Sequence, residues 1–296
     1  MRIFANFGYY LIDKVRPLYI NDSIEKVDID NDVFALGSTT IPVSINLLSW
    51  AFGKYSRGAV KVHTLLDLRG SIPNFILITN GKYHDSNILD ELYFIPNAFY
   101  VMDKAYVDMN ALYNIHSQDS FFVTRAKKNM KYHIIEENFN INELIGLRFD
   151  KKISLSVYKS NKIYSENLRL IGYYDTEKDE IFEFLTNNFD ITALEIANLF
   201  KNRWQIEVFF KWIKQNLTIK HLGGYTENAV KIHIWIAIIT YLLIAYIKKV
   251  FKSGLSIYEI IQIFRISLLD KTPIKELITN EKSIQDTNLQ LSLFDF

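Results

Sequence analysis

The chain has 296 residues, of which 49% are hydrophobic and 15% aromatic, with only 5 prolines. These proportions support one large or two ordinary domains with a sizeable core, and they exclude a disordered chain. Lys and Arg together number 34 against 33 for Asp and Glu, so a nucleic-acid surface would have to come from local clustering of basic residues rather than from net charge.

Cysteine is absent from the chain, which excludes disulfides and cysteine-based zinc sites and is compatible with the cytosol. The N-terminal segment lacks the apolar core and the small-residue cleavage site of a signal peptide. One long apolar run occurs, Ile232–Ile247. It is shorter than the roughly 20 residues that a membrane span needs, so we predict a buried core helix and no membrane partner.

The first half of the chain alternates strand and helix patterns. Runs rich in β-branched and aromatic residues predict strands within residues 33–41, 59–70, 73–81, 97–106 and 120–129. A short turn joins the second and third runs, which indicates a meander of adjacent strands. Helical spacing of apolar residues predicts helices over Ser86–Ile95, with Ser86 as the N-cap, and over Val107–Ser117.

The character of the sequence changes near Lys131. From there to Asp190, short runs alternate apolar and polar residues and are joined by turns, one of them at Ser160–Lys162, which is typical of antiparallel hairpins. Helical periodicity follows, and the last stretch, Thr279–Phe296, is weakly patterned. We therefore expect a mixed α/β fold divided into an N-terminal remnant or linker (1–32), a first core part (33–130), a β-rich insertion (131–190), core helices (191–250) and a helical tail (251–296).

The segment Leu199–Leu217 carries charge in an apolar setting. On a helix with about 100° per residue, Arg203, Lys211 and Lys214 fall within about 40° of Glu207. A solvated helix with i,i+4 pairs, each worth about 0.2–0.5 kcal/mol, is one interpretation. However, apolar side chains flank this stripe, and a second polar face is left to meet water. These features favour a cleft in which Glu207 holds Mg²⁺ and the cations hold substrate phosphates.

Four residues of this helix carry a resemblance to a known family. Phe200, Arg203, Glu207 and Lys214 match the spacing Y-x2-R-x3-E-x6-K, with phenylalanine in the tyrosine place. This pattern resembles the signature of bacterial DDE transposases of the insertion sequence 4 family. Blocks similar to that family follow in order from about residue 7 to residue 249: VKVHTLLDLRGSIPNFILITNGKYHDSNILDEL, AFYVMDKAYVD, FFVTRAK, FLTNNF, RWQIEVFFKWIKQNL and TENAVKIHIWIA.

The resemblance implies an RNase H-like core, in which a mixed sheet is flanked by helices and a β-rich insertion precedes the glutamate helix. It also implies three carboxylates that hold two Mg²⁺ ions, for which Mn²⁺ can substitute. One ion activates water or a 3′-hydroxyl, the other stabilises the leaving oxygen, and a DNA phosphodiester is displaced in line. By position, Glu207 is the glutamate and Asp103 the second aspartate. Taken alone, Asp103 would only be expected to cap a turn.

Gly37 stands where the family has its first catalytic aspartate, since a block resembling ALDSTTI is ALGSTTI in this chain. Two carboxylates would then have to hold two dications about 3.5–4 Å apart. Hard cations need anionic oxygen ligands, so we expect two-metal catalysis to be severely impaired. Asp32 lies about 16 Å away along an extended strand, which is out of reach. The hydroxyl of Thr39 is neutral, and Asp85 is the other candidate for a replacement ligand.

Two further features each have two interpretations. Arg125, Lys127, Lys128 and Lys131 form a basic cluster after a predicted core strand, and this cluster is either a solvated loop or a set of phosphate contacts. Trp204 either stacks on an unpaired base or is a core tryptophan. The candidates for DNA contact are Phe200, Arg203, Trp204, Lys211, Lys214 and the first three residues of the basic cluster.

The N-terminal part departs from the family pattern. Members of the family carry an additional helical DNA-binding region before the catalytic core. Here the first predicted strand begins at Val33, so we expect that region to be missing and recognition of the element's ends to be weakened. Phe200 lacks the tyrosine hydroxyl that can contact a phosphate, and we expect this loss to matter less.

The sequence therefore predicts a DNA transposase whose catalysis is impaired at Gly37. The resemblance implies double-stranded DNA at the element's terminal repeats as the partner, a homodimer on that DNA and a nucleoid-associated location in the bacterial cytoplasm. One alternative is a non-enzymatic remnant that occupies element ends or inhibits intact transposase. Another is a metal-dependent nuclease that uses Asp103, Glu207 and Asp85.

Overall fold

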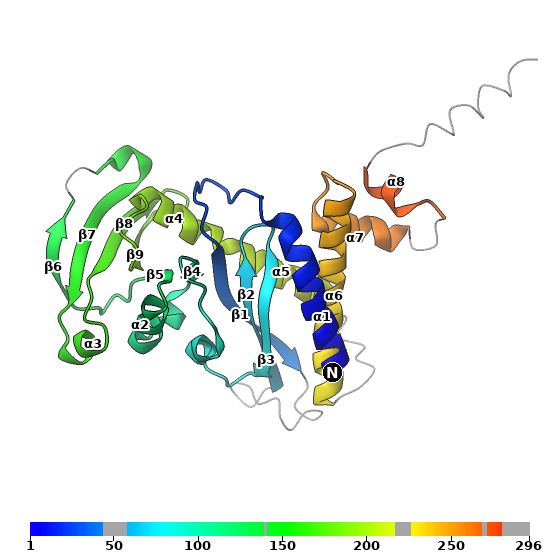
Figure 1. Ribbon diagram of the computed structural model, residues 1–296, viewed down its shortest axis with the longest axis horizontal. Coiled ribbons are helices and arrows are strands. Elements are labelled where there is room, and N and C mark those ends of the chain that lie inside the picture. The colour runs from blue at the N-terminus through cyan, green and yellow to red at the C-terminus, as the bar shows by residue number, and fades with distance from the viewer. Residues whose placement is uncertain (44–57, 139–140, 217–225, 268–270, 280–296) are drawn as a thin grey trace, which may run out of the picture.

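The computed structural model describes residues 1–43, 58–138, 141–216, 226–267 and 271–279. In this part of the chain a single mixed sheet has the strand order β3-β2-β1-β4-β5-β9-β8-β7-β6, with helices around it (Figure 1). The strands are β1 Val33–Val43, β2 Gly58–Asp67, β3 Ile72–Asn80, β4 Phe99–Met102, β5 Phe121–Arg125, β6 Tyr132–Glu137, β7 Leu147–Leu155, β8 Leu168–Asp175 and β9 Glu180–Thr186.

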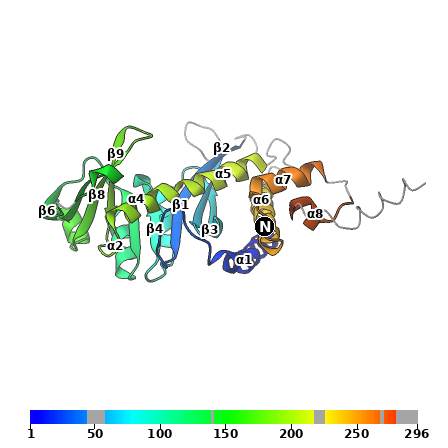
Figure 2. The ribbon, with the colours of Figure 1, turned by 90° about the horizontal axis from the view of Figure 1, so that it is seen from above.

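The helices cover both faces of this sheet, and α4 and α5 run across one of them (Figure 2). The α-helices are α1 Arg2–Val15, α2 Met109–Ser117, α3 Tyr158–Ile163, α4 Ala193–Asn202, α5 Trp204–Asn216, α6 Glu227–Val250, α7 Ile257–Ile266 and α8 Ile274–Thr279. Short 3₁₀ helices are η1 Arg16–Tyr19, η4 Asp85–Glu91, η5 Lys104–Tyr106 and η6 Glu143–Ile145.

Strand β1 is the centre of the core sheet. It pairs antiparallel with β2 and parallel with β4, and β4 pairs parallel with β5. The predicted meander is present as the antiparallel pair β2 and β3. The mixed sheet flanked by helices, expected from the resemblance, is thereby confirmed.

The strands of the β-rich segment continue the core sheet. Strand β9 pairs antiparallel with β5, and β8, β7 and β6 follow it outwards in antiparallel pairs. The segment expected as an insertion is therefore joined to the core by backbone hydrogen bonds. Helix α3 lies beside α2 and β7 in this half of the molecule.

Two local predictions were wrong. The helix expected to begin at Ser86 is the 3₁₀ helix η4, which begins at Asp85 after the cap His84 and buries Ile88 and Leu89. The turn expected at Ser160–Lys162 lies inside α3. There the Asn161 side chain donates to the Leu155 carbonyl (2.7 Å), which supplies a local partner that stabilises a helical turn.

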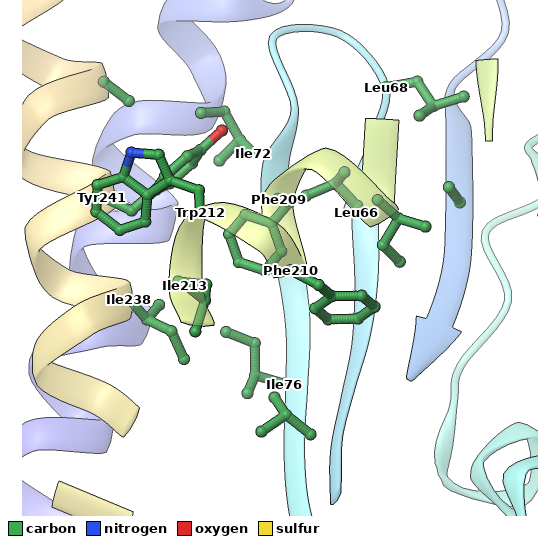
Figure 3. Close-up of a cluster of buried hydrophobic side chains, with 14 of the residues drawn as sticks. Leu66, Leu68, Ile72, Ile76, Phe209, Phe210, Trp212, Ile213, Ile238 and Tyr241 are labelled. Atoms are coloured by element: carbon green, nitrogen blue, oxygen red, sulfur yellow. The ribbon is translucent and has the colours of Figure 1, made fainter. Parts of the chain in front are cut away.

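The side chains of β1 alternate between two apolar clusters. Val33 and Ala35 pack with the α4–α6 side, whereas Phe34 and Leu36 face the side of α2 and η4. On the first side, aromatic residues of α5 lie between the sheet and α6 (Figure 3). The ring of Tyr241 contacts those of Phe209 and Trp212 edge to face, with 5.0 Å between ring centroids in each pair. This packing fixes α5 across the sheet.

Helix α6 carries the long apolar run. It is the one helix in the described ranges that is long and apolar enough to cross a membrane. Ten of its residues are buried, among them Ile238 and Leu242, and it contacts α1, α5 and α7. These contacts agree with the prediction of a core helix. The tail beyond Thr279 lies outside the described residues.

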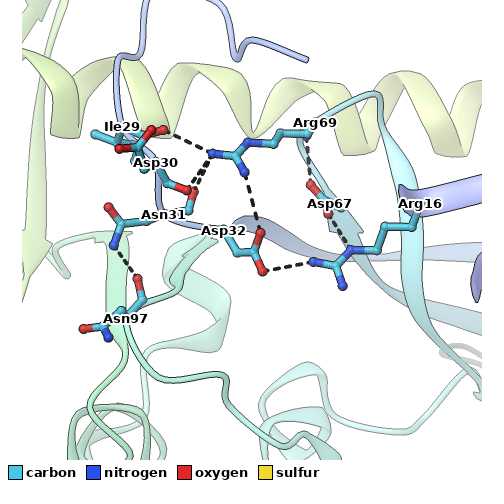
Figure 4. Close-up of polar contacts among 8 residues, drawn as sticks. All are labelled: Arg16, Ile29, Asp30, Asn31, Asp32, Asp67, Arg69 and Asn97. Atoms are coloured by element: carbon cyan, nitrogen blue, oxygen red, sulfur yellow. Dashed lines mark hydrogen bonds and ion pairs between the residues drawn. The ribbon is translucent and has the colours of Figure 1, made fainter. Parts of the chain in front are cut away.

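The N-terminal segment is tied to the sheet by charged groups (Figure 4). Helix α1 lies against α6 and β3. The Arg16 guanidinium donates through Nε to Asp67 Oδ2 (2.6 Å) and through Nη2 to Asp32 Oδ2 (3.1 Å). Arg69 donates to the backbone carbonyls of residues 29–31. Burial raises the pKa of Asp67, and the hydrogen bond from Arg16 opposes that rise.

We expect Arg16→Met to lower the free energy of unfolding at pH 7 by about 1–3 kcal/mol, because it leaves the buried carboxylate of Asp67 without its cation. Removing the cation raises the pKa of Asp67 further, so in the variant this carboxylate takes up a proton more readily as pH falls. The difference in free energy of unfolding between parent and variant therefore becomes smaller at low pH. Urea unfolding at pH 7 and pH 4.5 measures both effects. Lys26→Met, which breaks an exposed pair with Glu25, is the control and should cost under about 1 kcal/mol. An equal Arg16→Met deficit at both pH values would contradict this account.

Candidate active site

Gly37, inside β1, and Asp103, directly after the end of β4, occupy matching positions on neighbouring strands. Leu36 of β1 pairs with Met102 of β4 in parallel register, so each is followed at once by one of these two residues. Gly37 is buried, whereas Asp103 caps η5 and accepts a hydrogen bond from the Lys104 backbone N–H at 2.7 Å. Parallel pairing thus places side by side the two positions at which the resemblance implies aspartates.

Position 37 faces helix α5. A Cβ atom added to Gly37 would lie 2.9 Å from Ile206 Cδ1 and 3.3 Å from Phe210 Cε2. Glu207 directly follows Ile206, so the helix that carries Glu207 lies over position 37, where the resemblance implies an aspartate. The nearest atom is the end of a flexible side chain, and a small shift of Ile206 would make room for a larger residue.

Glu207 is paired with a cation in this structure. Its Oε1 lies 3.2 Å from Arg203 Nη1, and its side chain is 42% exposed. The prediction of one continuous helix through Arg203 was wrong, because α4 ends at Asn202 and α5 begins at Trp204. Tight hydrogen bonds at the break, from Arg203 N–H to the Phe200 carbonyl and from Ile206 N–H to the Arg203 carbonyl, keep the i,i+4 pair together.

Tyr106 connects these groups. Burial raises the pKa of its hydroxyl, and the negative charge of Asp85 adds to the rise, while Arg203 and Glu207 also act on it electrostatically. The hydroxyl is buried and has no hydrogen-bond partner of good geometry in the described part of the chain. Tyr106 thus lies in the electrostatic field of charged groups from η4 and from the start of α5.

The donor set does not fit a two-metal centre. Of the three family positions, only Asp103 and Glu207 carry a carboxylate, and Arg203 offsets the charge of Glu207. Among the residues that the structure describes, no group of three or more His, Cys, Asp or Glu could hold a metal ion. Two dications need more anionic oxygen than this site offers.

Asp85 is engaged elsewhere. Its Oδ1 accepts from Ser38 Oγ (2.6 Å) and from Lys61 Nζ (3.2 Å). Successive side chains of a strand point to opposite faces, so Ser38 points away from the face to which position 37 belongs. Asp85 is therefore bound across the strand from the missing ligand, with its charge balanced by Lys61. This arrangement speaks against Asp85 as the replacement carboxylate.

His63 is the buried neighbour of this cluster. Its side chain is inaccessible to solvent, its Nδ1 lies 3.8 Å from Asp85 Oδ1, and its Nε2 lies 3.1 Å from Thr79 Oγ1. Burial lowers the pKa of His63 to about 4, and the nearby Asp85 only partly opposes that shift. The imidazole is thus neutral at pH 7.

The residues predicted to contact DNA are divided between surface and core. On α5, Lys211 and Lys214 are exposed, and Trp204 is 66% exposed, so the alternative of a core tryptophan is excluded. Phe200, in contrast, packs on the ring of Phe184 at 4.8 Å between centroids. The exposed side chains of α5 are available to a large ligand.

The basic cluster after β5 is also mixed. The Arg125 guanidinium lies 4.4 Å from the centroid of the Phe182 ring and 3.6 Å from Glu180. Lys127 Nζ donates to the Val107 carbonyl (2.7 Å), and Lys128 is exposed. The cluster thus borders the turn that leads away from Asp103.

The sequence reasoning did not identify Ser38, Lys61 or Tyr106 as part of the site. Ser38 and Lys61 meet only through Asp85, which is 47 residues away from Ser38 along the chain. A lysine and a histidine on one face of an otherwise apolar strand were the available indication for Lys61. For Tyr106, the indication was its place three residues after Asp103 in a short turn.

Comparison with known proteins shows the family of this chain. The family described as transposase DDE domain matches residues 27–243. The chain belongs to this family, the DDE transposases.

Relatives named as transposases share about a third of the aligned residues. A probable transposase for insertion sequence element IS5377 of Geobacillus stearothermophilus is 31% identical over 218 residues, which are 71% of this chain and 55% of the relative. A transposase for insertion sequence element IS4SA of Synechocystis is 29% identical over 72% of this chain and 59% of the relative. The chain thus spans less than two thirds of the length of these relatives.

A piggyBac transposase synaptic complex with hairpin DNA, solved by cryo-EM, aligns with 92% of this chain and 62% of its own. The TM-score is 0.44 at 11% identity, which is too low to show a shared fold.

We expect the stability of the protein to fall between about pH 6.5 and pH 4, because His63 is neutral when folded and takes up a proton when unfolded. This group contributes up to roughly 3 kcal/mol, which is present above pH 6.5 and lost towards pH 4. His63→Gln should therefore show a smaller decrease over this range. Urea unfolding of parent and variant at pH 7, 5.5 and 4.5 measures the difference. Parallel pH profiles would contradict a buried neutral imidazole.

Proposed function

We propose that this protein is a transposase that binds double-stranded DNA at the terminal repeats of an insertion sequence, and that cleavage and strand transfer are severely impaired in this chain. The observation that carries the proposal is Gly37, whose missing side chain would face α5 beside Glu207, next to Asp103 in the parallel strand pair. The family's carboxylate triad thus has two members in this chain.

The cations around the site favour binding of the substrate even without full catalysis. Arg203, Lys211 and Lys214 lie on or beside α5, and the exposed ring of Trp204 is suited to stacking on a base. Arg125, Lys127 and Lys128 extend the basic surface towards β5. We assign these residues to phosphate contacts, with Arg203 moving from Glu207 to the DNA when a substrate is bound.

Divalent metal dependence belongs to the family, and Mg²⁺, with Mn²⁺ as its substitute, is the metal proposed here. A homodimer on DNA and a place at the nucleoid in the cytoplasm complete the proposal. The second candidate is a non-enzymatic remnant that occupies element ends or pairs with intact transposase and inhibits it. The contacts of Asp85 with Ser38 and Lys61 favour this candidate over a nuclease that would use Asp85 in place of a carboxylate at position 37.

The test compares the parent chain with Gly37→Asp. Each is incubated in Mg²⁺, and then in Mn²⁺, with a duplex carrying the element's own terminal repeat, as read from the genomic flanks. We expect the variant to cut at least roughly a hundredfold faster, because loss even of a group that only supports a ligand typically costs 10–100-fold. Gly37→Asn, with the same size and no charge, is the matched control and should stay inactive.

A second variant combines Gly37→Asp with Ile206→Val. It removes the Ile206 Cδ1 atom, which would lie 2.9 Å from the new Cβ, and so shows whether a steric clash alone keeps Gly37→Asp inactive. Adding Glu207→Gln to the active variant should abolish cutting. Equal cutting by the parent would show that three carboxylates are not needed here. If neither variant cuts but the parent binds the repeat, the remnant is the better account.

A further inference from the structure

A groove of about 370 Å³ lies beside the turn that follows Asp103. Three separate parts of the chain form it: residues 107–110 at the start of α2, residues 127–131 after β5, and the region of α3. Its volume is in the range of pockets that accept a nucleotide-sized group, about 300–1,000 Å³.

The groove is basic. Lys127, Lys131 and Lys159 line it, one from each side of the β5–β6 loop and one from α3. Lys127 Nζ is fixed on the Val107 carbonyl, which holds its charge at the wall. Lys131 and Lys159 are exposed, and neither pairs with a carboxylate in the part of the chain that the structure describes. Their charges are therefore free to meet an anion.

One acidic residue, Asp108, is among the described residues that line the groove. Its Oδ1 accepts from the backbone N–H groups of Asn110 (3.0 Å) and Ala111 (3.2 Å), as the N-cap of α2. These donors at the start of a helix offset its charge. The net charge of the side chains that line the groove is therefore positive.

The wall of the groove begins at Val107, four residues after Asp103 along the chain. The Tyr106 backbone N–H donates to the Asp103 carbonyl (3.0 Å), and the Val107 N–H donates to the Lys104 carbonyl (3.2 Å), so a tight turn joins Asp103 to the groove wall. A strand of DNA repeats its phosphate about every 3.4 Å along the duplex axis. A phosphate in the groove would thus belong to a nucleotide close to the one at Asp103.

We propose that this groove binds the phosphodiester backbone of the DNA strand that enters or leaves the active site, with Lys159 of α3 as its outer wall. The β-rich segment thereby takes part in DNA binding. The lysines are exposed and come from the β5–β6 loop and from α3, which suits an extended chain of phosphates. A small free anion would instead need enclosing, buried donors. This inference rests on the proposed function, since it takes DNA as the ligand.

The first test is the salt dependence of DNA binding. Fluorescence anisotropy gives the affinity of the parent, of Lys131→Gln/Lys159→Gln and of a control, Lys26→Gln/Lys178→Gln, for one labelled mixed-sequence duplex between 50 and 300 mM salt. The control removes the same charge from exposed sites outside the groove. We expect the slope of log K against log salt to fall by about 2 in the groove variant, one for each lysine, and to stay near the parent value in the control.

The second test uses the absence of cysteine, which makes any introduced thiol unique. A duplex with a disulfide-activated tether on one backbone phosphate should cross-link to Lys159→Cys, and excess inorganic phosphate should not compete. Lys178→Cys, exposed and outside the groove, should not react. Thermal unfolding of each variant confirms that it is folded.

The outcomes separate this inference from the function on which it rests. A parent that binds no DNA contradicts the proposed function itself. A parent that binds, with slopes equal in the two double variants and no preferential cross-link at Lys159→Cys, overturns the groove and leaves the function standing. Competition by inorganic phosphate at millimolar concentration would make the groove a small-anion site and would also overturn the proposal.

Discussion

The packing of α5 against strand β1 is the contact on which the site depends. Ile206 and Phe210 lie over Gly37, and the aromatic contacts of Phe209 and Trp212 with Tyr241 hold the other side of the helix on α6. Aromatic pairs in a close-packed core allow little movement. Glu207 is therefore held beside the sheet near Gly37, the position at which the family resemblance implies an aspartate.

Glycine at position 37 leaves this region with few carboxylates. Glu207 is paired with Arg203, and the side chains of Lys211 and Lys214 are exposed on the same helix. A site with fewer carboxylates is poorer for divalent metals and better for phosphates. Glu207 has Arg203 beside it, and Asp85, across the strand, has Lys61 beside it, so each of these carboxylates is paired with a cation.

The sequence predicted the parts of the fold that local patterns control. The central strands, the β2–β3 meander and the proximity of Arg203 to Glu207 follow from alternation and from helical spacing. The interruption between α4 and α5 at Arg203 could not be predicted from such patterns. The tight turn there keeps the same i,i+4 pairing that a continuous helix would give. The spacing of side chains alone cannot distinguish the two.

Local sequence patterns also could not predict which distant segments contact each other. The pairing of β9 with β5 joins residues about 60 positions apart, and the hydrogen bond from Ser38 to Asp85 spans 47. Asp85 was identified as a candidate ligand from its residue type. The structure supplies what the sequence lacked, namely the partner Lys61 that holds it on the other face of β1. Exposure of Trp204 likewise depends on which helices surround α5.

The central claim, that position 37 is a missing metal ligand, is tested most directly by metal binding in the absence of DNA. Thermal unfolding of the parent and of Gly37→Asp is followed as Mn²⁺ is added. A ligand that binds only the folded state stabilises it by about 2.7 kcal/mol at a hundredfold excess over its Kd, which corresponds to a shift of roughly 5 °C. The account predicts this shift for Gly37→Asp, its loss on adding Glu207→Gln, and none for the parent. An equal shift in the parent would contradict it.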